Sequence, residues 1–311
     1  MFHQPVLIYN PAAGKLRRNP EGILQRTKAA LARGRVGTEK PLELLPTTGP
    51  DMAGNLAREA IGRGADLVIV LGGDGTVNEV LQGMAQSSVP LGVLPGGTAN
   101  CLAMELGLGS RLERAVERLT ACQPKTVALG RATPAGVTAN GNGSASPSRW
   151  FLLMCGAGLD AAIVDEVHSG LKKSTGKLAY WVAGLAQFRR RVGPMKVEVG
   201  GKTFDCGFAL FSSIRNYGGD MEIASGASLL KDDFEIVLFE GTNPLRYAAY
   251  MMAVGIGQVQ KMPGVHTLRA QSAQLITPAP TQVDGEFFSR GAVRLEAVPN
   301  AITLLLPAGY K

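Results

Sequence analysis

The residues best suited to chemistry stand at positions 72–76, which read Gly-Gly-Asp-Gly-Thr. The three glycines allow positive φ angles and let the backbone approach a ligand closely. Thr76 and Glu79 form a capping-box pattern, so a helix is expected to begin here. The free N–H groups and the positive dipole end of a helix start attract anions, and the stretch therefore predicts a phosphate site.

A second interpretation of this stretch is a tight strand–helix turn whose glycines serve only the geometry of the chain. Asp74 disfavours that interpretation. A carboxylate beside a phosphate is repulsive unless a metal ion or a transferred proton accounts for it.

Another acidic group stands near the other end of the chain, where residues 284–286 read Asp-Gly-Glu. Asp-Gly is a hairpin-turn signal, so one interpretation is a solvated turn. The other is that one of these acids acts with Asp74, either to hold a metal or to accept a proton.

The elements that would position these residues follow from hydrophobic periodicity. Residues 67–71 form an uninterrupted apolar run, as in a parallel strand buried on both faces. Further strands are predicted at 5–9, 42–45 and 90–94, with helices between them, which indicates a parallel α/β sheet. Such sheets bind ligands beyond the carboxyl ends of their strands. The loops that follow these strand ends begin at Asn10, Thr47, Gly72 and Gly96.

The chain changes character near residue 128. Many short strands with turn signals follow, among them 195–199, 234–239, 292–297 and 301–305, and they predict an antiparallel β-sandwich or barrel. Strands are also predicted at 150–154 and 204–211, with a Gly/Ser-rich loop over 134–147 and a helix over 176–191. We therefore expect an α/β domain at 1–128, on which the tail 299–311 packs back, and a β-rich domain at 129–298, with the active cleft between them.

Composition limits the possible partners. The 311 residues carry a formal charge of +7, which suits nucleotides or acidic lipid headgroups. Nucleic acid is not expected as a partner, because no Lys/Arg run is interleaved with aromatic residues. The four scattered cysteines have no zinc-ligand spacing, and neither a signal peptide nor an 18-residue apolar run is seen, so a cytoplasmic protein is expected.

Taken together, the motifs resemble the diacylglycerol kinase catalytic-domain family, which includes bacterial soluble lipid kinases, sphingosine kinases and ceramide kinases. The glycine–aspartate motif alone is shared with NAD kinases and 6-phosphofructokinases, whereas the terminal Asp-Gly-Glu favours the lipid kinases. The resemblance spans nearly the whole chain in the correct order. It is carried by residues 72–76 with Asn78 and Glu79, 95–100 (Pro-Gly-Gly-Thr-Ala-Asn), Asn10-Pro11 with Gly14, 156–161, 176–180 and 283–286.

The resemblance implies ATP-dependent phosphorylation of a lipid hydroxyl, on diacylglycerol or a related lipid, with Mg²⁺ on the ATP phosphates. It makes Glu286 the general base and Asp74 an organiser of ATP and the metal. The residues that would contact ATP are Asn10, Thr47, Gly72, Gly73, Asp74, Gly75, Thr76, Asn78, Gly97 and Thr98.

Two positions depart from the family pattern. Cys101 stands where relatives often have an Asp that supports the catalytic network. Ser228, Lys231 and Asp233 stand near the positions of a structural Mg²⁺ site, with Lys231 at the position of an Asp ligand. Because an ammonium group cannot ligate Mg²⁺ but can replace its charge, we expect no structural metal there, unless Asp232 or Asp233 serves in a shifted register.

A kinase of this kind must reach lipid as a peripheral membrane protein. Two stretches could touch a bilayer: 178–185, bracketed by basic residues, and 245–259, rich in Tyr and Met. The alternative for each stretch is a core helix, and for 178–185 this alternative is favoured. The alternatives to a lipid kinase are a NAD kinase-type phosphotransferase and a catalytically silent nucleotide- or lipid-binding regulator. The lipid substrate and formation of a homodimer are left open.

Overall fold

The computed structural model describes residues 2–17, 19–33, 42–135, 148–159, 161, 193–218 and 221–311. The chain forms two compact units: unit 1, Met1–Leu129 with Pro299–Lys311, and unit 2, Gly130–Val298. The predicted helix over 176–191 and nearly all of the predicted loop over 134–147 lie outside the described residues.

Unit 1 is built on a parallel sheet with the strand order β2-β1-β3-β4, continued by the last part of β18. Its central strand β3 is buried along its whole length, which explains its uninterrupted apolar sequence. The strands are β1 (Pro5–Tyr9), β2 (Glu43–Pro46), β3 (Leu67–Gly72), β4 (Leu91–Pro95) and β18 (Ala292–Leu306).

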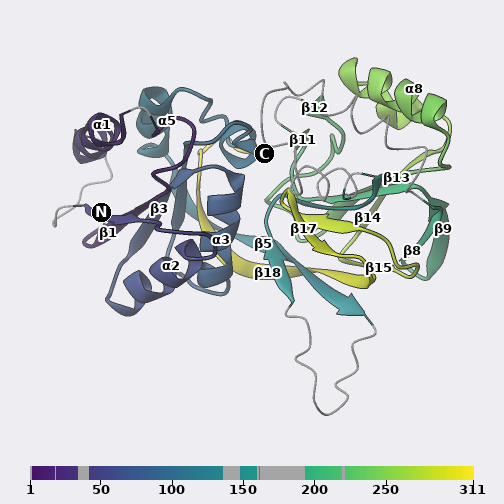
Figure 1. The fold of residues 1–311 in the computed structure, drawn as a ribbon, viewed down its shortest axis with the longest axis horizontal. Coiled ribbons are helices and arrows are strands. Elements are labelled where there is room, and N and C mark those ends of the chain that lie inside the picture. The colour runs from purple at the N-terminus through teal and green to yellow at the C-terminus, as the bar shows by residue number, and fades with distance from the viewer. Residues whose placement is uncertain are drawn as a thin grey trace, which may run out of the picture. The chain divides into compact units, whose positions relative to one another are not determined.

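Two pairs of helices cover the two faces of this sheet (Figure 1). The helices α1 (Pro20–Arg33) and α5 (Leu112–Leu119) pack together on one face. The helices α2 (Ala53–Gly62) and α3 (Asp74–Met84) pack together on the other, and the short α4 (Cys101–Glu105) follows β4. This doubly wound arrangement confirms the predicted parallel α/β fold.

The contact between α2 and α3 is a backbone contact through two glycines. A Cβ atom on Gly83 would overlap the carbonyl oxygen of Gly54, and a Cβ atom on Gly54 would lie 2.5 Å from the carbonyl oxygen of Glu79. Only glycine at both positions lets the two helices approach this closely.

Unit 2 is an antiparallel sandwich, also as predicted. One sheet has the strand order β14-β13-β10-β7-β16-β17, and the facing sheet contains β9, β8, β15, the first part of β18, β5 and β6. The strands are β5 (Gln123–Ala135), β6 (Arg149–Phe151), β7 (Met154–Gly158), β8 (Met195–Val199), β9 (Lys202–Cys206), β10 (Phe208–Ser212), β13 (Phe234–Phe239), β14 (Val265–Ala270), β15 (Ser272–Leu275), β16 (Thr281–Val283) and β17 (Glu286–Ser289).

The core of unit 2 lies between its two sheets. Phe211 and Phe234 from one sheet meet Phe151, Val197 and Leu295 from the other. The rings of Phe151 and Phe234 stack with their centroids 5.5 Å apart. Outside the sheets lie the two-stranded ribbon β11 (Asn216–Tyr217) and β12 (Met221–Glu222), the helix α8 (Pro244–Gly255) and the 3-10 helix η1 (Val259–Lys261).

Four strand predictions were wrong in detail. The stretch 150–154 contains the end of β6, a bend and the start of β7, and the stretch 204–211 is divided between β9 and β10 at Gly207. The stretches 292–297 and 301–305 are one continuous strand, β18. Hydrophobic periodicity does not show where a chain bends away from one sheet to reach another.

Replacing Gly83 by Ala should lower the free energy of unfolding by about 1–3 kcal/mol, because the added methyl group forces the α2 and α3 backbones apart. Gly62→Ala is the matched control in α2: nothing lies within 4 Å of its Cβ position, and it should be neutral or slightly stabilising. Urea unfolding of both variants measures the difference. Equal effects would contradict the proposed backbone contact.

Candidate functional site

The carboxyl edge of the unit 1 sheet gathers the loops expected to bind a ligand. Because β2, β1, β3 and β4 are all parallel, their following loops emerge at one edge. The strand order reverses between β1 and β3, and ligands of such sheets bind in the crevice at this point. Asn10 and Asp74 follow these two strands, and the N–H of Asn10 donates to the carbonyl of Leu71 at 3.2 Å.

The two glycine turns of this edge pack on each other. The N–H groups of Gly96 and Gly97 both donate to the carbonyl of Gly72, at 2.8 and 3.2 Å. A Cβ atom on Gly97 would lie 2.6 Å from the Cα of Gly73, and one on Gly96 would lie 2.9 Å from the Cα of Gly72. These glycines are therefore needed where one turn meets the other.

The predicted capping of the helix after β3 was wrong. Helix α3 begins at Asp74, with Gly73 as the N-cap at φ −90°, so Thr76 already lies inside the first turn. The Thr76 side chain is buried and lies close to Gly72. Glu79 reaches a different helix, because its Oε2 accepts the N–H of Ala53, 3.1 Å away, at the start of α2.

The three glycines of residues 72–76 do not use the positive φ angles that glycine allows. In this region the left-handed residue is Asn100, at φ 51°. Its side chain bridges the backbone of Gly97, accepting from the N–H at 2.8 Å and donating to the carbonyl at 2.9 Å. Asn100 thus holds the second turn in shape and leaves the neighbouring Thr98 exposed.

Asn10 and Lys15 order the loop after β1. The Oδ1 of Asn10 accepts the N–H of Ala12 at 2.9 Å, which forms a tight turn. The Lys15 ammonium donates to the carbonyl of Pro95 at 3.1 Å and to that of Ser110, and so fastens this loop to the second glycine turn. Burial lowers the pKa of Lys15, and the nearby Glu113 carboxylate opposes that effect. None of the sequence motifs singled out Lys15.

The remaining predicted ligand contacts differ in exposure. Thr47 and Asp74 are half-buried at the carboxyl edge, and the N–H of Thr47 donates to the carbonyl of Tyr9 at 2.9 Å. Asn78 is fully buried, and its Oδ1 lies 3.3 Å from the Nε2 of Gln82. Asn78 therefore belongs to the interior of unit 1. Cys101 begins α4 and is buried.

In unit 2, Asp284 and Gly285 form the turn between β16 and β17. Both have positive φ, 48° and 86°, and Val283 pairs with Glu286, so this is a two-residue hairpin. The interpretation of Asp284 as a solvated residue was wrong. Its side chain is buried, and its carboxylate accepts the N–H groups of Leu152, Leu153 and Met154 at 2.9, 2.9 and 3.0 Å.

Glu286 is the first residue of β17, directly after this turn. Its Oε2 accepts a charge-assisted hydrogen bond from the guanidinium of Arg149 on β6, and both side chains are partly buried. Among the residues that the structure describes, no partner is found for the second carboxylate oxygen, Oε1. Sequence reasoning missed Arg149, which belongs to no recognised motif.

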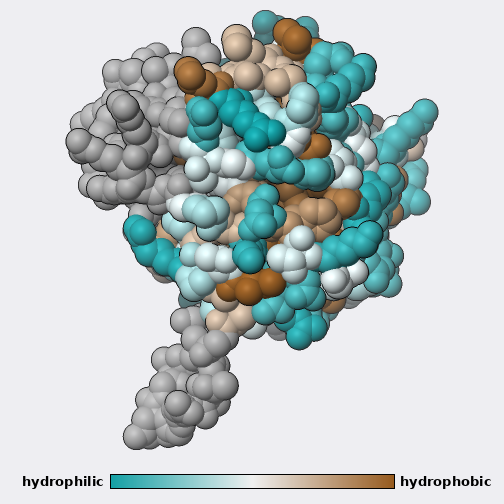
Figure 2. Space-filling view, turned by 90° about the vertical axis from the view of Figure 1, so that its right-hand side faces the viewer, coloured by the Kyte–Doolittle hydropathy of each residue, from teal (hydrophilic) through white to brown (hydrophobic). Residues whose placement is uncertain are grey.

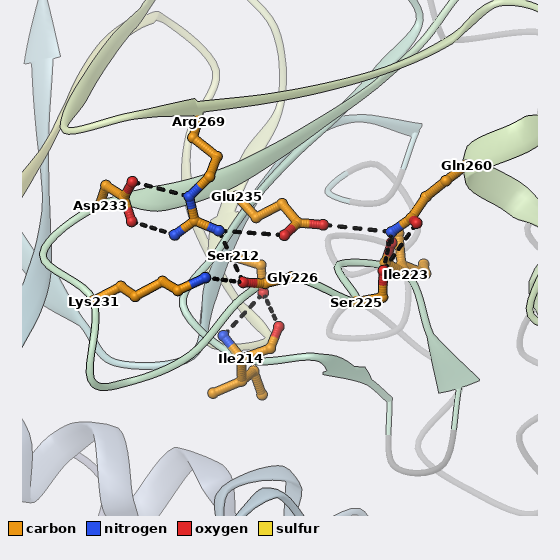
Figure 3. A network of polar contacts seen from close by, with 10 residues as sticks. All are labelled: Ser212, Ile214, Ile223, Ser225, Gly226, Lys231, Asp233, Glu235, Gln260 and Arg269. Carbon is orange, nitrogen blue, oxygen red and sulfur yellow. Dashed lines mark hydrogen bonds and ion pairs between the residues drawn. The ribbon is translucent and has the colours of Figure 1, made fainter. Parts of the chain in front are cut away.

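The residues near the family's structural metal positions contact two side-chain cations, Lys231 and Arg269 (Figure 3). Lys231 and Arg269 both donate to the carbonyl of Gly226, at 2.9 and 2.8 Å. The Asp233 carboxylate pairs with the Arg269 guanidinium on two sides. This donor set does not fit a divalent cation, because the carboxylate is neutralised by Arg269 and an ammonium group holds the carbonyl.

The buried Glu235 extends this network. It lies 3.5 Å from the Arg269 guanidinium and accepts from Gln260 at 3.4 Å. Gln260 also donates to the carbonyl of Ile223 at 3.2 Å. The loop before β13 is therefore linked to β14 by Arg269 and to η1 by Gln260.

Thermal unfolding without nucleotide should give the same melting temperature in EDTA and in millimolar Mg²⁺, since Lys231 and Arg269 supply the positive charge at this loop. Lys231→Asp should lower the melting temperature in EDTA, and Mg²⁺ should restore part of the loss. Lys202→Asp on β9, an exposed lysine, is the control and should not respond to Mg²⁺. A Mg²⁺-dependent rise in the unsubstituted protein would contradict this view of the loop.

Two family models match the chain. Residues 4–132 match the diacylglycerol kinase catalytic domain, and residues 154–306 match the YegS C-terminal NAD kinase beta sandwich-like domain. A solved structure of a diacylglycerol kinase from Bacillus anthracis str. Sterne shares the fold, with a TM-score of 0.72, 22% identity, and coverage of 99% of this chain and 98% of that one.

Two curated relatives are both named diacylglycerol kinase. The Mycobacterium tuberculosis protein is 28% identical over 82% of this chain and 81% of its own length. The Bacillus subtilis protein is 30% identical over 76% of this chain and 74% of its own length. With the two model matches in sequence order and the same fold in both units, the chain belongs to the diacylglycerol kinase family.

Proposed function

We propose that the protein is an ATP-dependent lipid kinase that transfers the γ-phosphoryl group of ATP to the hydroxyl of diacylglycerol or a related lipid. The observation that carries the proposal is the one-sided pairing of Glu286, which leaves Oε1 as a proton acceptor. Family membership supports a kinase. Of the two motifs, residues 72–76 would bind the nucleotide and residues 284–286 would provide the base.

The carboxyl edge of unit 1 supports the nucleotide part of the proposal. Helix α3 begins there, directly after a turn without side chains, so its first N–H groups can meet a polyphosphate. The residues proposed to contact ATP are Asn10, Thr47, Gly72, Gly73, Asp74, Gly75, Thr76, Gly97 and Thr98. The buried Asn78 is proposed to support α3 from within.

Asp74 is proposed to organise the Mg²⁺ ion that ATP carries. Its carboxylate is a hard oxygen donor of the kind Mg²⁺ prefers, and it stands half-buried at the start of α3. When bound, the ion would neutralise the charge that develops on the phosphates.

In the proposed reaction, the lipid hydroxyl oxygen attacks the γ-phosphorus, and the bond from that phosphorus to the ADP oxygen breaks. The hydroxyl proton passes to Oε1 of Glu286. Phosphoryl transfer proceeds through a loose transition state, so catalysis is mostly positioning and charge stabilisation. A carboxylate can serve as base because it accepts the proton late.

Replacing Glu286 by Gln should lower the turnover number for lipid phosphorylation by about 10²- to 10⁴-fold, the usual contribution of a general base. ATP binding should be unchanged, because the nucleotide residues lie in unit 1. Glu296→Gln on β18 is the matched control, a second carboxylate held by an arginine, Arg131, at 2.6 Å. Transfer of labelled phosphate from ATP to lipid measures turnover, and normal turnover of Glu286→Gln would exclude it as the base.

A NAD kinase-type activity is the second candidate, because the model matched by the sandwich is described as NAD kinase-like. The same assay separates the candidates when diacylglycerol, monoacylglycerol, a sphingoid base, ceramide and a long-chain polyprenol are tested beside NAD. Label in one of the lipids supports the proposed function. Label in NAD alone would replace it, and label in none would favour the catalytically silent regulator.

We further propose that α8 lets the protein dock on a lipid surface. Among the described residues, no helix is both long and apolar enough to cross a bilayer. One face of α8 is core, with Tyr247 and Tyr250 buried against Phe239. The other face exposes Leu245 and Met252, and the exposed C-cap residue Ile256 follows directly after the helix; their exposed fractions are 81%, 69% and 73%.

These three side chains are seven and four residues apart, so they form one stripe along the helix. Figure 2 shows hydrophobic side chains at the top of the side of the molecule in view, where α8 lies. The two interpretations of 245–259, a membrane contact and a core helix, thus each describe one face of α8. The other candidate, 178–185, lies outside the described residues.

Met252→Glu and Ile256→Glu should each weaken binding to phosphatidylglycerol-containing vesicles about tenfold or more, since burying such a side chain contributes about 1.5–3 kcal/mol. Gln258→Glu adds the same charge at an exposed polar position nearby and is the control. Vesicle sedimentation measures binding. If all three variants bind equally well, α8 is not the docking surface.

A further inference from the structure

We propose that Arg149 is the positioning residue of the catalytic base: it holds one oxygen of Glu286 and thereby presents the other to the lipid hydroxyl. This inference rests on the proposed function, because it assumes that Glu286 is the base. It goes beyond that function by assigning a role to a residue outside the recognised motifs.

The first argument is the geometry of the pair. The terminal nitrogen of Arg149 contacts Oε2 of Glu286, and no partner for Oε1 is found in the described part of the chain. A glutamate whose carboxylate oxygens both lack a hydrogen bond would sample several rotamers. A hydrogen bond at Oε2 restricts the rotamer, and Oε1 then points in a narrow range of directions. A planar guanidinium is well suited to this task, since its donors have a fixed orientation.

The second argument is that both partners stand on a backbone that is itself fixed. Arg149 lies on β6, where its backbone pairs with Ala132 of β5. Asp284 receives the three N–H groups that follow β6, and Glu286 lies only two residues beyond Asp284. The buried Asp284 carboxylate therefore fastens the strand that carries the cation to the hairpin that carries the base.

The third argument comes from a comparison with a neighbouring ion pair. Arg131 on β5 pairs with Glu296, but that carboxylate is engaged at both oxygens, by Arg131 at Oε2 and by Arg294 at Oε1, 2.9 Å away. Arg131 also lies over the ring of Trp150. A carboxylate with both oxygens paired to arginines suits a structural role. In the pair of Arg149 and Glu286, Oε1 of the carboxylate is left to accept a proton.

The test compares Arg149→Ala, Arg149→Lys and the control Arg131→Ala in the labelled-phosphate assay. Arg149→Ala should lower kcat about 10²-fold, the usual loss when a reacting group is misplaced, while KM for ATP changes less than twofold. Arg149→Lys should recover part of kcat, because an ammonium group keeps the charge but lacks the planar fork. Arg131→Ala should keep kcat.

Three results would overturn the inference. Normal kcat in Arg149→Ala means that Glu286 needs no positioning. A raised KM for ATP with kcat unchanged means that Arg149 binds the nucleotide instead. Equal losses of kcat and of melting temperature in Arg149→Ala and Arg131→Ala mean that the loss is general destabilisation of the sandwich.

Glu286→Gln, measured in parallel, separates this inference from the proposed function. If Glu286→Gln is inactive and Arg149→Ala is normal, only the positioning role fails. If both retain full turnover, the assignment of Glu286 as base fails as well. If Glu286→Gln is normal while Arg149→Ala is inactive, Arg149 acts by a route that does not pass through Glu286, and the inference is wrong.

Discussion

The buried Asp284 carboxylate accepts three consecutive backbone N–H groups, those of Leu152 and Leu153 between β6 and β7 and that of Met154 at the start of β7. Leaving buried donors unsatisfied costs about 1–3 kcal/mol each, so this contact holds together a part of unit 2 that strand pairing alone would leave open. Asp284 also belongs to the two-residue turn with Gly285, where both residues have positive φ. Glu286 and its partner Arg149 are placed on either side of this contact.

A comparable constraint acts in unit 1, where backbone meets backbone without side chains between. Gly72 and Gly73 contact Gly96 and Gly97, and Gly54 of α2 contacts Gly83 of α3. Such contacts set the position of the α3 start and bring its first N–H groups to the switch point of the sheet. The glycines therefore serve the protein's own packing before any ligand is bound.

In unit 2, side-chain cations of the protein itself hold the loop before β13. Lys231 and Arg269 bring two positive charges to the Gly226 carbonyl and the Asp233 carboxylate, which is the role a divalent cation would otherwise fill. A tethered cation costs less entropy to bind than a free one and cannot be chelated away. By contrast, the described residues of unit 2 leave the apolar stripe of α8 exposed to solvent. This exposure agrees with its proposed role at a lipid surface.

Local sequence patterns were enough to predict the architecture and the loops at the carboxyl edge of unit 1. The apolar run of β3, the alternation of strands with helices, and the short strands of the second half were enough for both fold classes, because burial periodicity is a local property. The loops at the carboxyl edge followed from the parallel sheet. The Asp-Gly turn before Glu286 was also readable, since its dihedral preferences are local.

The partners that these residues take follow from contacts across the fold, which local sequence does not reveal. Glu79 caps α2 rather than its own helix, Asp284 is buried rather than solvated, and Arg149 meets Glu286 across 137 positions of the chain. A side chain's local pattern states what it can donate or accept, but not which distant group the fold brings within reach. That choice depends on packing between strands and helices, which no short stretch of sequence contains.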